Sequence, residues 1–255
     1  MRAFNDADVV HVDTEHDPKK DIEVINTELI LADLQTIDRR IPKAEKEARV
    51  DPKLKPAYET LLKAQKLLDA GTPLSATEDI NLDDIKDLQL LTAKPVVYLF
   101  NVDEETLADT SKKEELQKLV LPAQAVFVCA KLENELQTLD ETDRAELLNS
   151  YGVSESGLVQ LTHAAYKILG LQSYLTAGEQ EVRAWTIAKG STAPQAAGVI
   201  HGDFERGFIA AQIVSYADLI ASGSEAAAKA AGKIRTEGKT YVMQPDDVVE
   251  FRFNV

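Results

Sequence analysis

The sequence predicts an α/β protein built on a parallel sheet. Residues 96–100 are five consecutive apolar residues, and they run directly into the polar sequence Asn101-Val102-Asp103-Glu104. This pattern is typical of a buried strand in a parallel sheet, whose carboxyl end lies where α/β proteins bind their ligands. A second apolar run, residues 125–128, follows the charged, helix-favouring segment 111–119. A helical connection of that kind is what two parallel neighbouring strands require.

The composition is that of a globular protein. The 255 residues suffice for one large domain or two ordinary ones, and 44% apolar with 28% charged residues excludes a disordered chain. A net charge of −15 argues against general binding to nucleic-acid phosphates, although it does not exclude a local basic face. The single cysteine excludes an internal disulfide framework and fits a reducing compartment. No apolar run approaches the length of a membrane span and residues 1–6 are not a signal peptide, so we expect a cytoplasmic protein without a membrane partner.

The first 91 residues are predicted to be a strand end followed by helices. Residues 1–13 resemble the end of a strand and its exit loop, where His11 and His16 are expected to be loop residues. Asp17-Pro18 then starts a helix. Its apolar residues recur at three- and four-residue steps: Ile22, Ile25, Leu29, Ile30, Leu34, Ile37 and Ile41. Pro42 should kink or end this helix.

A second helix, ending at Gly71, carries the apolar residues Tyr58, Leu61, Leu62, Ala64, Leu67 and Leu68. We expect it to run antiparallel to the first helix, from which residues 50–52 separate it. The two helices could form a hairpin arm that projects from a domain, or a plain bundle within the core. A third helix, residues 83–91, is predicted to lead into the strand at residues 96–100.

Two loops at the predicted sheet edge are the candidate binding site. Asn101–Glu104 has the form Asn-x-x-acid, where P-loop GTPases carry Asn-Lys-x-Asp and use the Asp to bind guanine. Glu104 is one methylene longer, so its carboxylate would fit guanine poorly, and a misfitted polar contact discriminates strongly. The structural alternative is an acidic helix start, where Asp and Glu are favoured.

The second loop, Cys129-Ala130-Lys131, follows the strand at residues 125–128, where those GTPases carry Ser-Ala-Lys. In them the Ala backbone N–H faces the base ring, and the spacing of strand, loop, helix, strand and loop is the same here. We interpret Cys129 as a small buried residue and not as a redox group.

The rest of the chain changes in character after Gly170. Residues 133–148 and 158–169 are predicted to be helices, the latter with His163 in a structural role. Residues 174–178 and 181–187 indicate a β-hairpin, and Ser191 or Thr192 can cap a short helix. Further strands are predicted at residues 208–214, 240–242 and 248–255. Residues 201–208, with His201, are predicted to form a polar, aromatic loop that is either a contact surface or an ordinary turn. Strands, one helix and a late strand suit a small β-grasp module.

Six segments of the chain carry recognisable motifs. They are Leu-Leu-Thr-Ala-Lys-Pro at residues 90–95, the loop at 101–104, Glu-Val-Arg-Ala-Trp-Thr at 181–186, residues 192–204, Phe-Arg-Phe-Asn-Val at 251–255, and the helix start at 21–34. Together these segments resemble the YchF subfamily of Obg-like ATPases. The resemblance covers essentially the whole chain. It implies the C-terminal part of a P-loop G domain (residues 1–16 and 92–169), an inserted helical coiled-coil hairpin (17–91) and a C-terminal TGS domain of β-grasp type (171–255).

The resemblance also implies a ligand. Family members prefer ATP over GTP, a preference attributed to Asn-x-x-Glu. Asn101, Val102 and Glu104 would line the adenine, with Ala130 and Lys131 on its other side. The expected function is that of a nucleotide-dependent regulator near the ribosome or in stress responses. The alternative is an adaptor that binds RNA or regulatory proteins through the helical arm and TGS domain, independently of nucleotide.

The chain departs from the family pattern at the phosphates. It contains no Gly-x-x-x-x-Gly-Lys-[Ser/Thr] motif and no Asp-x-x-Gly switch. In the family both precede the first strand, so we expect this chain to be the C-terminal part of a longer protein. Phosphate positioning and Mg²⁺ supply most of the catalysis in phosphoryl transfer. We therefore expect no catalytic residue here, no hydrolysis of ATP by this chain alone, and Mg²⁺ binding only with the missing part. We also expect residues 171–255 to fold alone, and residues 1–16 and 92–169 to pack poorly in isolation.

Overall fold

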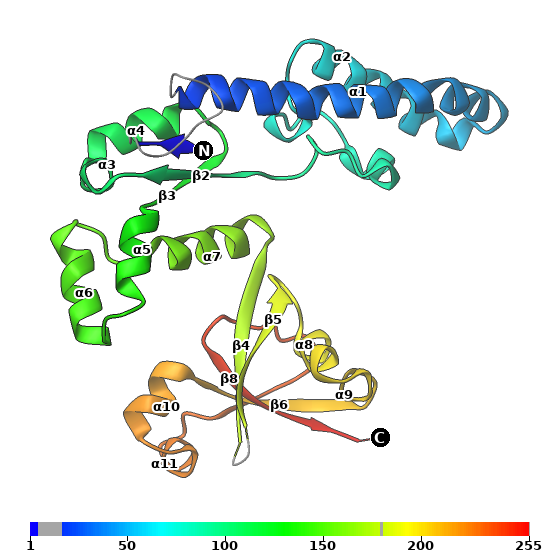
Figure 1. The fold of residues 1–255 in the computed structure, drawn as a ribbon. Helices are drawn as coiled ribbons and strands as arrows, with labels where there is room; N and C mark the ends of the chain where they lie inside the picture. Colours follow the sequence, from blue (N-terminus) through cyan, green and yellow to red (C-terminus); the bar gives the residue numbers. More distant parts are fainter. Residues whose placement is uncertain (5–16, 179–180, 255) are drawn as a thin grey trace. The chain divides into compact units, whose positions relative to one another are not determined.

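The computed structural model describes residues 1–4, 17–178 and 181–254 (Figure 1). It divides into two compact units, Met1–Ala165 and Tyr166–Val255. The β-like run predicted at residues 9–12, with His11 and His16, lies outside the described residues.

The first unit contains a parallel sheet of three strands. These are β1 (Arg2–Ala3), β2 (Val97–Val102) and β3 (Gln124–Val128), in the order β1-β2-β3. Between β2 and β3 the chain forms α3 (Glu104–Ala108) and α4 (Thr110–Lys118). In the register Asn101 lies opposite Val128, so the two strands end at the same edge of the sheet. The predicted α/β fold with a parallel sheet is confirmed.

Complete burial of the strand at residues 96–100 was a wrong prediction. Phe100 and Val102 are buried in the core of the unit, and the Phe100 ring stacks on Phe127 with 5.7 Å between centroids. Val97 and Leu99 are only half-buried. Successive side chains of a strand point to opposite faces, and it is the Phe100 face that packs against the apolar cluster of this unit.

Three helices follow β3, and one of them approaches the sheet closely. They are α5 (Ala130–Leu136), α6 (Glu141–Ser150) and α7 (Gly157–Ile168). The single helix predicted at residues 133–148 is therefore two helices, because Asp140 accepts hydrogen bonds from the backbone N–H groups of Thr142 and Asp143 and starts α6. A Cβ at Gly157 would lie 2.6 Å from the Val128 side chain, so this approach of α7 to β3 requires glycine.

Two long helices pack side by side in the same unit (Figure 1). α1 (Pro18–Val50) and α2 (Lys55–Asp69) are joined by a 3₁₀ turn, Pro52–Leu54, so α2 returns along α1. Pro42 does not end α1, contrary to one of the two predicted outcomes. Ile37 and Ala44, on either side of it, are buried against α2, and this packing offsets the hydrogen bond that proline cannot donate.

The segment before β2 is fixed to α1 through one buried carboxylate. Asp33 accepts hydrogen bonds from Leu91 N at 2.8 Å, Thr92 N at 2.7 Å and Thr92 Oγ1 at 2.6 Å. The helix predicted at residues 83–91 is a 3₁₀ segment, Leu82–Leu88, which Ile85 interrupts with a φ of −130°. Asp33 thus sets where the chain enters β2, the strand that carries Asn101 near its end.

The second unit is a five-stranded mixed sheet with four helices in its described part. The strands are β4 (Leu171–Ala177), β5 (Val182–Ala188), β6 (Phe208–Ser215), β7 (Arg235–Glu237) and β8 (Asp247–Phe253), in the order β5-β4-β8-β6-β7. β4 and β8 are parallel, and the other pairs are antiparallel. The helices are α8 (Ala193–Ile200), α9 (Gly202–Arg206), α10 (Tyr216–Ser222) and α11 (Glu225–Ala230).

The sequence predicted some elements of this unit correctly and missed others. The β4–β5 hairpin and the helix after Thr192 are confirmed. Residues 240–242 are not a strand, since only Val242 forms a bridge, with Thr192, and β7 takes the place beside β6. Residues 202–206 form helix α9 and not a loop, because His201 Nδ1 accepts from Asp203 N at 3.2 Å and caps it. Helices α10 and α11 were not predicted. No helix among the described residues is long and apolar enough to cross a membrane.

Candidate functional site

The two loops predicted to form a binding site meet at the carboxyl edge of the first sheet. Asn101, near the end of β2, accepts a hydrogen bond at its Oδ1 from the backbone N of Ala130, the first residue of α5, at 3.2 Å. The bond joins residues 29 positions apart. Because β2 and β3 are neighbours in register, the Asn side chain can bridge from one strand end to the next.

A second contact joins the same loops one turn further along. Lys131 Nζ lies 2.8 Å from Glu104 Oε1, with 34% of the Glu104 side chain and 70% of the Lys131 side chain exposed. The hydrogen bond to Glu104 is the main cause that raises the pKa of the Lys131 ammonium. Two bridges therefore hold the loops together: one between neutral groups at the sheet edge and one between charged groups nearer solvent.

The position of Glu104 is fixed by the start of α3. Asp103 is the N-cap of this helix and accepts a hydrogen bond from Thr106 N at 2.8 Å. Burial raises the pKa of the Asp103 carboxyl, but the hydrogen bonds from Thr106 and the nearby Lys112 ammonium outweigh it and lower that pKa overall. The structural alternative for this loop, an acidic helix start, therefore describes it correctly. The signal in the sequence is an Asp followed directly by two Glu residues.

Four of the five predicted site residues come together, and the fifth side chain points elsewhere. Asn101, Glu104, Ala130 and Lys131 form the two bridges. The Val102 side chain is 2% exposed and packs in the apolar core. Only the backbone of Val102 is therefore available to contact a ligand. Cys129, between β3 and α5, is a free cysteine buried in the same core, as predicted.

His163 and His201, the two histidines that the structure describes, take no part in this site. His163 Nδ1 lies 3.2 Å from Glu155 Oε2 on an exposed surface, and His201 caps α9 in the second unit. Among residues 1–4, 17–178 and 181–254, no group of three or more His, Cys, Asp or Glu side chains could hold a metal ion. The loops offer amide, carboxylate and ammonium groups at a sheet edge, which suits hydrogen bonding to a planar polar ring.

Comparison with known proteins places this geometry in a family. Residues 171–254 match the YchF-GTPase C-terminal family, described as a protein of unknown function (DUF933). The chain is similar to the ribosome-binding ATPase YchF of Bacillus subtilis (strain 168), with 46% identity over 263 residues that cover 100% of this chain and 72% of that protein. It is also similar to the Obg-like ATPase 1 of Caenorhabditis elegans, with 43% identity over 99% of this chain and 66% of that protein.

A solved structure agrees with these relatives. The YchF GTPase of Schizosaccharomyces pombe matches with a TM-score of 0.83 at 32% sequence identity, over 98% of this chain and 70% of that one. Identity of this degree across essentially the whole chain confirms the resemblance that the sequence motifs indicated. The chain belongs to the YchF family of Obg-like ATPases.

Proposed function

We propose that the loops after β2 and β3 bind the base of ATP in a YchF-type regulatory protein, and that Glu104 makes adenine preferred over guanine. The observation that carries this proposal is the pair of bridges, Asn101 to Ala130 and Glu104 to Lys131. They hold two sequence-distant loops at the edge where α/β proteins bind ligands. Asn101 then has a positioning role, and Glu104, Lys131 and the Val102 backbone would contact the base.

Glu104 is suited to reject guanine for two reasons. Its carboxylate extends one methylene further than the Asp of guanine-binding loops, and Lys131 already engages it at 2.8 Å. The N–H donors of a bound guanine would have no hydrogen-bond acceptor. Burying an unpaired donor costs more binding free energy than one good hydrogen bond contributes. The Ala130 N–H, expected to face the ring, donates to Asn101 in this structure. A base acceptor would have to share or replace that bond.

The remaining parts of the family assignment are also proposals. We infer that α1 and α2 are the coiled-coil insertion, because two long helices return along each other with a shared apolar cluster. We infer that the second unit is a TGS domain of β-grasp type. Its first and last strands, β4 and β8, run parallel side by side in the middle of the sheet, and α8 packs on one face.

Hydrolysis is not proposed for these 255 residues alone. They contain no phosphate-binding Gly-x-x-x-x-Gly-Lys-[Ser/Thr] motif, and the phosphate loop with its Mg²⁺ supplies most of the catalysis in phosphoryl transfer. Because relatives are named ribosome-binding ATPases, we propose the ribosome as the partner. The alternative is a nucleotide-independent adaptor, which the absence of a phosphate-binding motif from these 255 residues favours. Capture of ribosomes that does not respond to ATP would support the adaptor.

The proposed site is tested by locating where nucleotide binds. We expect ATP, titrated into the ¹⁵N-labelled chain, to shift the backbone amide signals of residues 101–104 and 129–131 more than GTP does. Asn101→Ala should weaken the ATP response by about fivefold, since one hydrogen bond contributes about 1 kcal/mol. Asn149→Ala, an exposed position on α6 of the same unit, is the matched control and should change nothing. Signals that shift elsewhere, or equally with both nucleotides, would contradict the proposal.

A further inference from the structure

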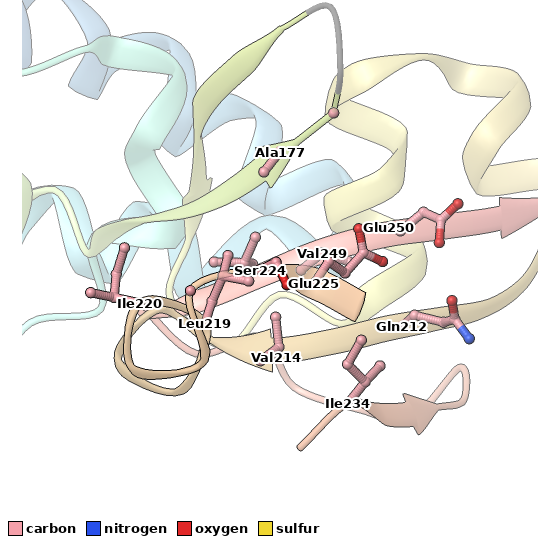
Figure 2. Close-up of a pocket in the computed structure, with 13 residues that line it drawn as sticks. Ala177, Gln212, Val214, Leu219, Ile220, Ser224, Glu225, Ile234, Val249 and Glu250 are labelled. Atoms are coloured by element: carbon pink, nitrogen blue, oxygen red, sulfur yellow. The ribbon is translucent and has the colours of Figure 1, made fainter. Parts of the chain in front are cut away.

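The second unit contains a pocket that the proposed nucleotide site does not use (Figure 2). Its volume is about 480 Å³, within the range of about 300–1,000 Å³ that is usual for small-molecule sites. The lining residues come from the end of β4, from β6 and β8, from α10, from the turn into α11, and from the segment before β7. The pocket therefore lies entirely within one unit.

The register of β6 and β8 explains why a pocket forms here. Val214 lies opposite Val248, and Gln212 lies opposite Glu250, so these four side chains share one face of the sheet. The residues between them pack against α8 on the other face. Leu219, on α10, and the buried Ala228 of α11 cover the Val214–Val248 pair. Gln212 is half-buried and Glu250 is exposed. The two helices therefore cover the Val214–Val248 pair but not the Gln212–Glu250 pair.

The interior of the pocket is apolar. Val214 and Val248 are buried and form its floor, and Leu219 and Ile234 extend that surface. At the mouth, Ile220 is 61% exposed, and Figure 2 shows it among the lining side chains. An apolar surface that is concave and open to solvent gains free energy when a ligand covers it.

The charged groups of the pocket are both acidic. Glu225, the first residue of α11, and Glu250, on β8, line it, and none of its thirteen lining residues is a Lys, Arg or His. In the part of the chain that the structure describes, neither carboxylate has an ion-pair partner. Two cations of this unit are engaged elsewhere, since Lys233 lies 3.2 Å from Asp218 and Arg235 lies 3.7 Å from Asp247.

We propose that this pocket binds a small apolar molecule that carries one ammonium group, an aliphatic or aromatic monoamine. The hydrocarbon part covers the valine floor, and the ammonium group lies between the Glu225 and Glu250 carboxylates. The half-buried Gln212 amide next to Glu250 supplies a further acceptor. Charge complementarity selects against a carboxylate of the same shape, because like charges repel at a site without a basic group.

The test uses three probes of similar shape on the 255-residue chain. Phenethylammonium, 2-phenylethanol and 3-phenylpropionate are titrated at one ionic strength, while the amide signals of the ¹⁵N-labelled protein are recorded. We expect saturable shifts at pocket residues such as Gln212, Ser224 and Glu250, with affinity decreasing from the ammonium ion to the alcohol to the carboxylate. Equal affinity for the three probes, or shifts outside the pocket, would overturn the proposal.

Charge-neutral variants separate the ammonium contact from the apolar one. Glu225→Gln and Glu250→Gln should each weaken phenethylammonium binding by about two- to fivefold, as expected for partly exposed ion pairs, and leave 2-phenylethanol unchanged. Glu237→Gln, on β7 and outside the pocket, is the matched control. Ile220→Ser should weaken the binding of phenethylammonium and of 2-phenylethanol to a similar degree. Binding of a lysine-containing peptide without binding of the free amine would show that the pocket serves a protein partner and would overturn the small-molecule class.

Discussion

Asp33 shows how one side chain can position the strand that leads to the candidate site. It lies on α1, it is 2% exposed, and its carboxylate accepts three hydrogen bonds from Leu91 and Thr92. Those residues precede β2, whose end carries Asn101. The carboxylate thus connects the helical pair to the strand of the candidate site, although Asp33 itself is far from it in sequence.

Replacement of Asp33 should therefore destabilise the protein more than replacement of an exposed carboxylate does. Asp33→Ala leaves buried N–H and O–H donors without an acceptor, and we expect it to lower the free energy of unfolding by about 3 kcal/mol. Urea unfolding monitored by circular dichroism measures the change, and amide hydrogen exchange at Leu91 and Thr92 should accelerate. Asp38→Ala is the control, because Asp38 is an exposed residue on the same helix. Similar losses in both variants would show that the buried hydrogen bonds contribute little.

Residue spacing predicted which side chains meet at the candidate site, but it did not predict all their directions. Asn101, Glu104, Ala130 and Lys131 follow two strands joined by a helix, and parallel strands end at one edge, so their proximity could be expected. Val102 was grouped with them from the family motif. Strand alternation turns its side chain into the core beside Phe100. The bond from Ala130 N–H to Asn101 depends on the turn geometry after β3, which no residue pattern specifies.

At the scale of elements, the start of α3 joins stability to the binding loop. Asp103 caps this helix, and its pKa in the folded protein is below the usual 3.8. A carboxyl with a lowered folded-state pKa stabilises the fold at pH values above its unfolded-state pKa. That contribution disappears as the pH falls from about 3.8 through the folded-state pKa.

We therefore predict a pH-dependent difference between the protein and its Asp103→Asn variant. Asn also caps helices well, so the variant loses only the charge effect, about 0.3–1 kcal/mol for a partly exposed helix N-terminus. The protein should be more stable than the variant above about pH 5, and the difference in unfolding free energy should shrink as the pH falls below 3.8 and through the folded-state pKa of Asp103. Glu114→Gln removes an exposed charge on α4 and serves as the control. A difference that persists at low pH would show that Asp103 acts through something other than its charge.

Elements with a strong apolar period or a clear cap were predictable, and those set by tertiary contacts were not. The β4–β5 hairpin and α8 were found because alternation and the cap at Thr192 are local signals. The sequence left open whether Pro42 kinks or ends α1, because the burial of Ile37 and Ala44 against α2, which keeps the helix continuous, is a tertiary contact. β7 was missed since Arg235–Glu237 carries no apolar pattern and is a strand only through pairing with β6.

At the scale of the whole molecule, the chain consists of two units with separate cores. The apolar clusters around Tyr174 and Val214 involve residues of the second unit alone. We predict that limited proteolysis releases a stable C-terminal fragment that begins near residues 166–171, because a domain with its own core can fold independently. Mass spectrometry of the fragments and circular dichroism of the isolated product measure this. Complete digestion of the C-terminal part would contradict the prediction.

The proposed base site predicts that Glu104 selects the nucleotide. The most direct test is competition between ATP and GTP for the protein and for Glu104→Asp, with Glu105→Asp as the matched control, since Glu105 lies next to it and pairs with Lys112 instead. We predict that the protein favours ATP, that Glu104→Asp shifts the ATP-to-GTP ratio toward GTP by about fivefold or more, and that Glu105→Asp leaves it unchanged. An unchanged ratio in Glu104→Asp would show that Glu104 does not select the base.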